Sequence, residues 1–254
     1  MKYPEIYLAI DNCFASKRWS EPMEWARVIN ELGLSYVEAS ADNECDPLYG
    51  GPDYLADWIN QVKQAEEKYG IKVVNLYSGH GTYATLGLQH YDVRVRERIL
   101  NDWLKPMKIN AGKLNAGLGF YCHAFSNNVL QNPISYQERY NDLINSLADL
   151  AATVSEGCEA IGLEQMYTPH QIPWTINGAS ALMQEVYKKA GAPLYMTIDT
   201  GHQSGQRKFP RPETQVLQDV INMFRRGKKT KGVWYGPEIV IQMLQEGAKK
   251  QASE

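Results

Sequence analysis

Short apolar runs alternate along the chain with longer segments in which apolar residues recur every three or four positions. Short apolar runs bounded by turn residues are typical of buried strands, and the longer periodicity is typical of amphipathic helices. The pattern predicts strands at 5–11, 36–41, 72–77, 113–119, 160–166 and 194–199. It predicts helices at about 20–33, 53–69, 92–104, 136–154, 179–190, 212–224 and 237–249.

The segment 136–154 is the clearest helix, because its apolar side chains form one stripe. Gly70 and Gly191 each follow a predicted helix, and glycine is the residue expected where a helix ends in the left-handed conformation. Pro106 is predicted to stop or kink the helix at 92–104. The members of the stripe are Tyr136, Tyr140, Leu143, Leu147, Leu150 and Val154.

Strands that alternate with helices at this spacing predict a parallel sheet covered by helices. The predicted fold class is α/β, of the (β/α)8 TIM-barrel type, in a single domain 1–254. Six strand–helix units already reach about 224, and the remainder holds one further short β-prone run, GVWY at 232–235. We therefore expect the last one or two units to be missing or incomplete. An open sheet exposes strand edges, so we expect a longer natural protein or a partner chain, most simply a homo-oligomer.

Composition and charge exclude several classes of protein. The chain has 254 residues, of which 44% are hydrophobic and 22% charged, as in an ordinary globular protein. A formal net charge of −3 argues against an obligate nucleic-acid binder. No apolar run approaches the ~20 residues of a membrane span, and the first one meets Asp11 too early for a signal peptide. The four cysteines form no CxxC pair, so we expect reduced thiols and a cytoplasmic protein with no membrane partner.

Two neighbouring predicted strands each end in a carboxylate, at Glu164 and Asp199, and His202 follows the aspartate by three residues. We expect both carboxylates to point into one polar cavity at the carboxyl end of the barrel. A buried charged carboxylate is unfavourable unless it is compensated, which a divalent metal does well. The alternative is that Asp199 caps the following turn and His202 is merely nearby. The polar residues at predicted strand ends are Asp11, Glu38, His80, His123, Glu164, Asp199 and His202.

From about 5 to 202 the chain resembles the xylose isomerase-like TIM-barrel superfamily, which contains sugar isomerases and epimerases, inosose-processing enzymes and AP endonucleases. The resemblance is most specific at Glu164 in GLEQM and at Asp199-x-x-His202. It implies that Glu164 and Asp199 are ligands of one divalent metal (Mn, Mg, Co or Zn). It also implies that His202 contacts the substrate, as in the epimerases, or binds metal, as in the endonucleases.

The sequence departs from the family pattern after His202. The family takes a further histidine from the seventh strand and an acid from the eighth. The run at 232–235 offers neither, and His202 is the last histidine in the chain. We therefore expect the metal site to be incomplete within this chain.

The leading hypothesis is a metal-dependent isomerase or epimerase of a ketose or a related sugar or polyol ketone, acting by proton transfer through an enediolate. Its substrate is a small-molecule sugar. Glu164 is the expected catalytic acid or base as well as a ligand, Asp199 is a ligand, and His202 acts on a substrate oxygen. The expected substrate-binding residues are His80, His123, Gln165, Trp19 and Trp174.

Two alternatives remain. A metal-dependent AP endonuclease-like hydrolase accounts equally well for Glu164 and for Asp199 with His202, but it predicts several metals and a basic surface. The basic run at 225–231 lies far along the chain from these motifs. A non-catalytic sugar-binding barrel that has lost its metal ligands accounts for the missing downstream ligands. A metal analysis separates the three readings.

Overall fold

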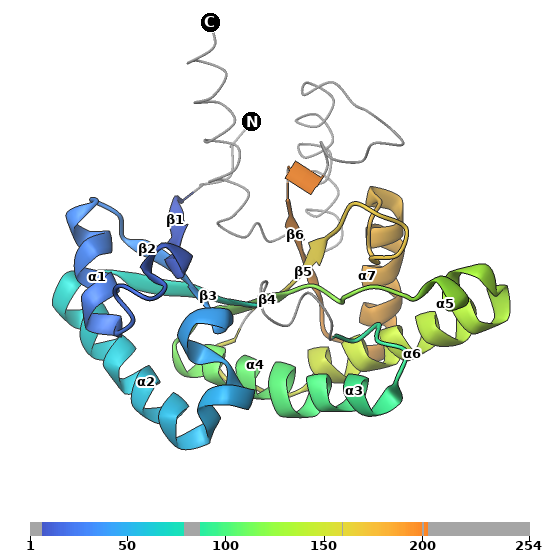
Figure 1. Ribbon diagram of the computed structural model, residues 1–254, viewed down its shortest axis with the longest axis horizontal. Helices are drawn as coiled ribbons and strands as arrows, with labels where there is room; N and C mark the ends of the chain where they lie inside the picture. The colour runs from blue at the N-terminus through green and yellow to red at the C-terminus, as the bar shows by residue number, and fades with distance from the viewer. Residues whose placement is uncertain (1–6, 79–86, 159, 200, 203–254) are drawn as a thin grey trace, which may run out of the picture.

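The computed structural model describes residues 7–78, 87–158, 160–199 and 201–202. Within them, six parallel strands form one sheet in which neighbours along the chain are also neighbours in the sheet. This confirms the predicted α/β class as a partial TIM barrel (Figure 1). The strands are β1 (Ala9–Asp11), β2 (Tyr36–Ser40), β3 (Lys72–Ser78), β4 (Gly117–Phe120), β5 (Ile161–Gln165) and β6 (Tyr195–Ile198).

Helices connect successive strands and lie along the outer side of the sheet (Figure 1). The α-helices are α1 (Pro22–Glu31), α2 (Pro47–Tyr69), α3 (Val93–Arg98), α4 (Lys105–Lys113), α5 (Asn127–Gln131), α6 (Pro133–Ala152) and α7 (Ile176–Ala190). The shorter helical turns are η1 (Asn12–Ala15), η2 (Ala41–Cys45) and η3 (Ile99–Leu104). Gly70 and Gly191 end α2 and α7 in the left-handed conformation, as predicted.

The two faces of the sheet differ in chemistry. One face carries apolar side chains such as Val37, Val73 and Leu163, which share the hydrophobic core with Trp25 of α1 and Leu143 of α6. Successive residues of a strand point to opposite sides, so the alternate positions form a second face, which we call the inner face. Its buried side chains with polar atoms are Glu38, Ser40, Asn75, Tyr77, Glu164 and Thr197.

The predicted helix end at Pro106 and the predicted strand start at 113 are both wrong. The π-helical turn η3 leads directly into α4, and Pro106 lies in the first turn of α4. Pro106 is not at a free helix start, because Leu104 and Lys105 before it are helical. The backbone hydrogen bond that proline cannot donate falls next to the π-helical turn, where the helical ladder is already irregular. The helical segment therefore runs to Lys113, and β4 begins at Gly117.

Glu38 was predicted at the end of a strand, and the structure places it in the middle of β2 instead. It is paired in register with Asp11 on one side and Asn75 on the other. Its exposed fraction is 1%, so it belongs to the interior of the barrel and not to its rim.

Several predictions concern residues outside the described ranges. These are the helices at 212–224 and 237–249 and the β-prone run at 232–235, so the single domain 1–254 stays a prediction. Within the described residues, β1 and β6 each have a paired strand on one side only. No helix in this part of the chain is long and apolar enough to cross a membrane.

Candidate functional site

Glu164, Asp199 and His202 come together at the carboxyl ends of β5 and β6. The two strands pair in parallel with Glu164 beside Thr197, so Asp199 leaves β6 close to Glu164. One ligating atom from each of the three side chains lies within 4.8 Å of the other two. Both carboxylates are buried, and the His202 side chain is 21% exposed. The structure thus brings the two predicted carboxylates into one group with the predicted histidine.

The His202 ring lies between the two carboxylates. Its Nδ1 is 3.2 Å from Oε1 of Glu164 and 2.9 Å from the backbone oxygen of Gln165. Its Nε2 is 3.3 Å from Oδ2 of Asp199. A carbonyl oxygen can only accept, so the bond to Gln165 assigns a proton to Nδ1. The other ring nitrogen, Nε2, and Oδ2 of Asp199 are close enough for a proton or a cation to lie between them.

This donor set fits a divalent metal. Carboxylate oxygens and imidazole nitrogens are ligands of Zn and of related ions, at bond lengths of ~2.1 Å, which puts neighbouring ligand atoms roughly 3.0–3.4 Å apart. The 3.3 Å between His202 Nε2 and Asp199 Oδ2 lies in that range. Because one ligating atom of each of Glu164, Asp199 and His202 lies within 4.8 Å of the other two, the two carboxylates could hold the ion, with His202 beside them.

Two aromatic residues that were not predicted contact this group. The Tyr77 hydroxyl on β3 donates to Oε2 of Glu164. The Tyr167 ring, which is 40% exposed, lies 4.8 Å from the His202 ring between centroids. Tyr167 follows GLEQM by one residue, so its place after a strand end was visible in the sequence. The contact of Tyr77 with Glu164 across the sheet was not visible in the sequence.

A second acidic residue lies deeper on the inner face. Burial, together with the negative charges of Asp11 and Glu164, raises the pKa of Glu38 from 4.5 to about 8. The amide of Asn75 donates to Oε2 of Glu38 at 2.5 Å and acts in the opposite direction. Glu38 is therefore mostly protonated at pH 7, which limits the negative charge below Glu164.

Gln165 and Trp174 contact each other. Gln165 is fully buried, and its amide nitrogen donates to the backbone oxygen of Trp174 at 3.2 Å. Because Gln165 follows Glu164 on β5, the two side chains point to opposite faces. The backbone oxygen of Gln165, and not its side chain, touches His202. Trp174 is half-buried.

The other predicted substrate contacts lie on other loops. His123, which is half-buried just beyond β4, has a backbone φ of +68° and stacks on His90 with 6.2 Å between ring centroids. Trp19 packs against Phe14 at 6.2 Å, with the Arg18 guanidinium 5.5 Å from its ring. His80 lies outside the described residues.

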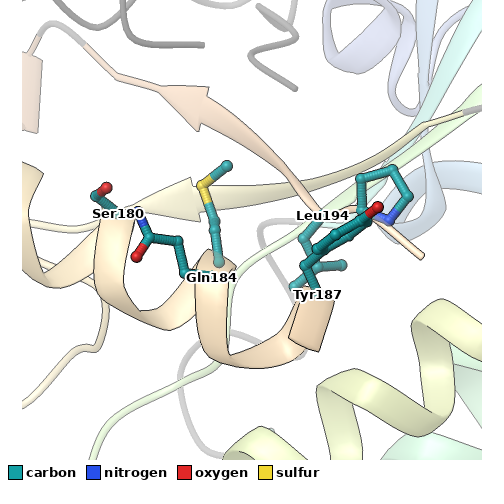
Figure 2. A pocket seen from close by; sticks show the side chains of 6 residues that line it. Ser180, Gln184, Tyr187 and Leu194 are labelled. Carbon is teal, nitrogen blue, oxygen red and sulfur yellow. The ribbon is translucent and has the colours of Figure 1, made fainter. Parts of the chain in front are cut away.

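An open pocket on the outer surface is distinct from this group. It lies between α7 and the start of β6 (Figure 2). Pro193 and Leu194 line it before β6 begins, whereas Asp199 follows the end of the same strand. At about 3.3 Å per residue, the four residues of β6 separate the pocket from the carboxylates. Its lining residues are Ser180, Met183, Gln184, Tyr187, Pro193 and Leu194.

Comparisons with known proteins agree with this architecture. The model of the xylose isomerase-like TIM barrel family matches residues 26–231. No curated protein matches the chain. A candidate xylose isomerase from Rhodospirillum rubrum ATCC 11170 has a similar structure, with a TM-score of 0.68 and 22% identity over 78% of this chain and 67% of that one.

Two sugar epimerases also have similar structures. D-allulose 3-epimerase from Methylomonas sp. has a TM-score of 0.58 and 17% identity over 81% of this chain and 67% of that one. The 3-keto-D-glucoside 4-epimerase from E. coli has a TM-score of 0.59 and 15% identity over 91% of this chain and 92% of that one. At these identities the likeness is one of fold.

Proposed function

Because the chain belongs to the xylose isomerase-like TIM barrel family, we propose that it is a metal-dependent isomerase or epimerase of a ketose or a related sugar or polyol ketone. The observation that carries the proposal is the group of Glu164, Asp199 and His202, two buried carboxylates and an imidazole at the carboxyl ends of adjacent parallel strands. The names of two structural neighbours, both sugar epimerases, support the choice of substrate class.

The reaction removes a proton from the carbon next to a carbonyl and returns it to the opposite face or to the neighbouring carbon. A divalent ion held by Glu164 and Asp199 would supply Lewis-acid stabilisation of the negative charge that develops on the substrate oxygens. Glu164 is the proton acceptor in this proposal. Its Oε2 accepts a hydrogen bond from Tyr77, and its Oε1 is directed towards His202 at 3.2 Å, the side on which the substrate would bind.

His202 acts on a substrate oxygen in this proposal. The bond from Nδ1 to the Gln165 carbonyl fixes the ring orientation, and Nε2 is the nitrogen that remains for exchange with substrate. Tyr167 adds an aromatic wall beside the ring. His80, His123, Trp19 and Trp174 stay proposed substrate contacts. The buried side chain of Gln165 points away from Glu164, so its proposed role is limited to the backbone oxygen that contacts His202.

Proton exchange tests the proposal directly. The full chain with added Mn²⁺ should exchange a carbon-bound proton of its ketose with deuterated solvent, as followed by NMR across a panel of ketoses. Glu164→Gln should slow that exchange by about 10²–10⁴-fold, the usual effect of losing a general acid or base. The matched control is Glu156→Gln, an exposed glutamate, which should exchange at the wild-type rate. Wild-type exchange in Glu164→Gln would remove this residue from the mechanism.

Elemental analysis separates this function from the two alternatives. The described residues contain one Glu, Asp and His group that could hold a metal, which agrees with a single ion per chain. Several ions per chain would favour an endonuclease-like hydrolase. No bound ion and no exchange with any ketose would favour a non-catalytic sugar-binding barrel. The cytoplasmic location and the homo-oligomer stay predictions.

A further inference from the structure

The Tyr77 ring lies across the neighbouring strand β4. Tyr77 is paired in register with Gly119, and Gly119 with Gly162 on β5, so two glycines lie beside the tyrosine on the inner face. A Cβ atom at Gly119 would lie 2.6 Å from Cδ2 of the Tyr77 ring, which is closer than packed carbon atoms approach. The ring can occupy this position only because residue 119 has no side chain.

The hydroxyl of this ring reaches β5. Glu164 lies two residues beyond Gly162 and therefore on the same face, and its Oε2 accepts the hydrogen bond from Tyr77. The exposed fractions of Tyr77 and Glu164 are 4% and 2%, so water does not compete freely for this bond. The other oxygen, Oε1, faces His202 at 3.2 Å. The two carboxylate oxygens thus have different partners.

We propose that Tyr77 is a positioning residue for Glu164, and that Gly119 provides the space it needs. The inference rests on the proposed function. The terminal torsion of a glutamate is broad and roughly two-fold, so an unrestrained carboxylate presents either oxygen or both. The bond from Tyr77 selects one orientation, in which Oε1 is directed towards His202. Hydrogen bonds of this kind to metal-binding side chains typically change metal affinity or activity by about 10–100-fold.

The test is Tyr77→Phe, which removes the hydroxyl and keeps the ring. Two measurements on the full chain are needed: the metal-free crystal structure and the Mn²⁺ dissociation constant by calorimetry. We expect the Glu164 carboxylate to turn away from its wild-type orientation and the dissociation constant to rise about 10–100-fold. The variant should still fold but unfold at a lower temperature, because a buried carboxylate oxygen has lost its donor. The control is Tyr187→Phe on α7, whose side chain is exposed, and it should change neither measurement.

A second variant tests the hydrogen bond between Tyr77 and Glu164 through a substitution on β4. Gly119→Ala keeps the hydroxyl but displaces the ring, so it should turn the carboxylate and weaken Mn²⁺ binding as Tyr77→Phe does. Its control, Gly117→Ala, lies on the same face of the same strand, and its Cβ would meet Oδ1 of Asn75 at 2.9 Å. We expect Gly117→Ala to leave the orientation of Glu164 unchanged.

The outcomes are separable. An unchanged Glu164 orientation in Tyr77→Phe, or an unchanged Mn²⁺ affinity where the wild type binds the ion, overturns the positioning role. If the wild-type protein binds none of Mn²⁺, Mg²⁺, Co²⁺ and Zn²⁺, the proposed function fails, and the metal-free structures alone decide whether Tyr77 sets the orientation of Glu164.

Discussion

Asp199 contacts His202 through both of its carboxylate oxygens. Oδ1 accepts the backbone N–H of His202 at 3.0 Å, and Oδ2 lies 3.3 Å from Nε2 of the ring. A side-chain oxygen that accepts the backbone N–H three residues later, as Asp199 does from His202, is typical of a cap at the start of a helix or turn. The capping interpretation of Asp199 and the site interpretation are therefore compatible, because each uses a different oxygen.

We predict that Asp199→Asn separates the two roles. The amide oxygen still accepts the His202 N–H, so the free energy of unfolding should stay within about 1 kcal/mol of wild type. The negative charge is lost, so the Mn²⁺ dissociation constant should rise at least about tenfold, as for a lost ligand. Calorimetric titration and urea unfolding of the same samples give both numbers.

The comparison for this variant is Asp199→Ser, since serine is also a good cap but a poor ligand. It should unfold much as Asp199→Asn does and also bind Mn²⁺ weakly. If either variant binds Mn²⁺ as tightly as wild type, Asp199 only caps the turn.

Lys108 is predicted to stabilise the end of α6. Its exposed fraction is 5%, and its ammonium donates to the backbone oxygens of Leu150, Ala151 and Thr153 at 3.1, 3.0 and 2.5 Å. The last carbonyls of a helix have no partner in the helix and attract positive charge. Lys108→Met removes this donor from all three oxygens, of which that of Leu150 keeps the backbone N–H of Thr153 at 3.2 Å, and should lower the free energy of unfolding by about 2–4 kcal/mol.

Lys105 on the same helix provides the control. Its salt bridge to Asp149 has an Nζ–Oδ2 distance of 2.7 Å, but the aspartate side chain is 55% exposed. Lys105→Met should therefore change the free energy of unfolding by less than about 1 kcal/mol. Equal losses in the two variants, measured by urea unfolding, would contradict the capping role of Lys108.

The sequence predicted those features that depend on local chemistry. The strands 72–77 and 160–166 match β3 and β5 within one residue at each end, because apolar runs bounded by turns are decided locally. The meeting of Glu164 with Asp199 followed from a topological rule, since parallel strands present their carboxyl ends together. Whether these residues bind metal and substrate is a question for the experiments above.

Features that depend on distant partners were not predicted. Lys108 is an unremarkable helix residue in the sequence, and its burial depends on the end of α6, more than forty positions away. Tyr77 and Glu164 are 87 positions apart in the sequence, and their contact depends on the space at Gly119. A glycine in a strand does not indicate which side chain from another strand fills that space. Glu38 was grouped with the strand-end residues although the predicted strand 36–41 already placed it inside the strand, as β2 does.

Glu44 provides a last prediction, on pH dependence. Its Oε2 accepts the indole N–H groups of Trp25 and Trp58 at 3.0 and 2.9 Å, and its Oε1 accepts from Asn12. Burial raises the pKa of Glu44 from 4.5 to about 7, although these three donors lower it. Between about pH 4.5 and 7 the folded protein holds a proton that the unfolded chain has lost. Linkage then requires the free energy of unfolding to fall as pH rises through this window, and the contribution of Glu44 to level off above it.

Glu44→Gln cannot titrate, so its free energy of unfolding should fall less steeply than that of wild type between pH 5 and 7. A single proton accounts for a slope of at most about 1.4 kcal/mol per pH unit. The raised pKa of Glu38, about 8, should leave a residual slope of the same sign in both proteins. Urea unfolding at pH 5, 6 and 7, followed by tryptophan fluorescence, measures the difference. Glu156→Gln, which changes an exposed glutamate, should keep the wild-type slope, and parallel curves for Glu44→Gln and wild type would show that Glu44 is ionised throughout this range.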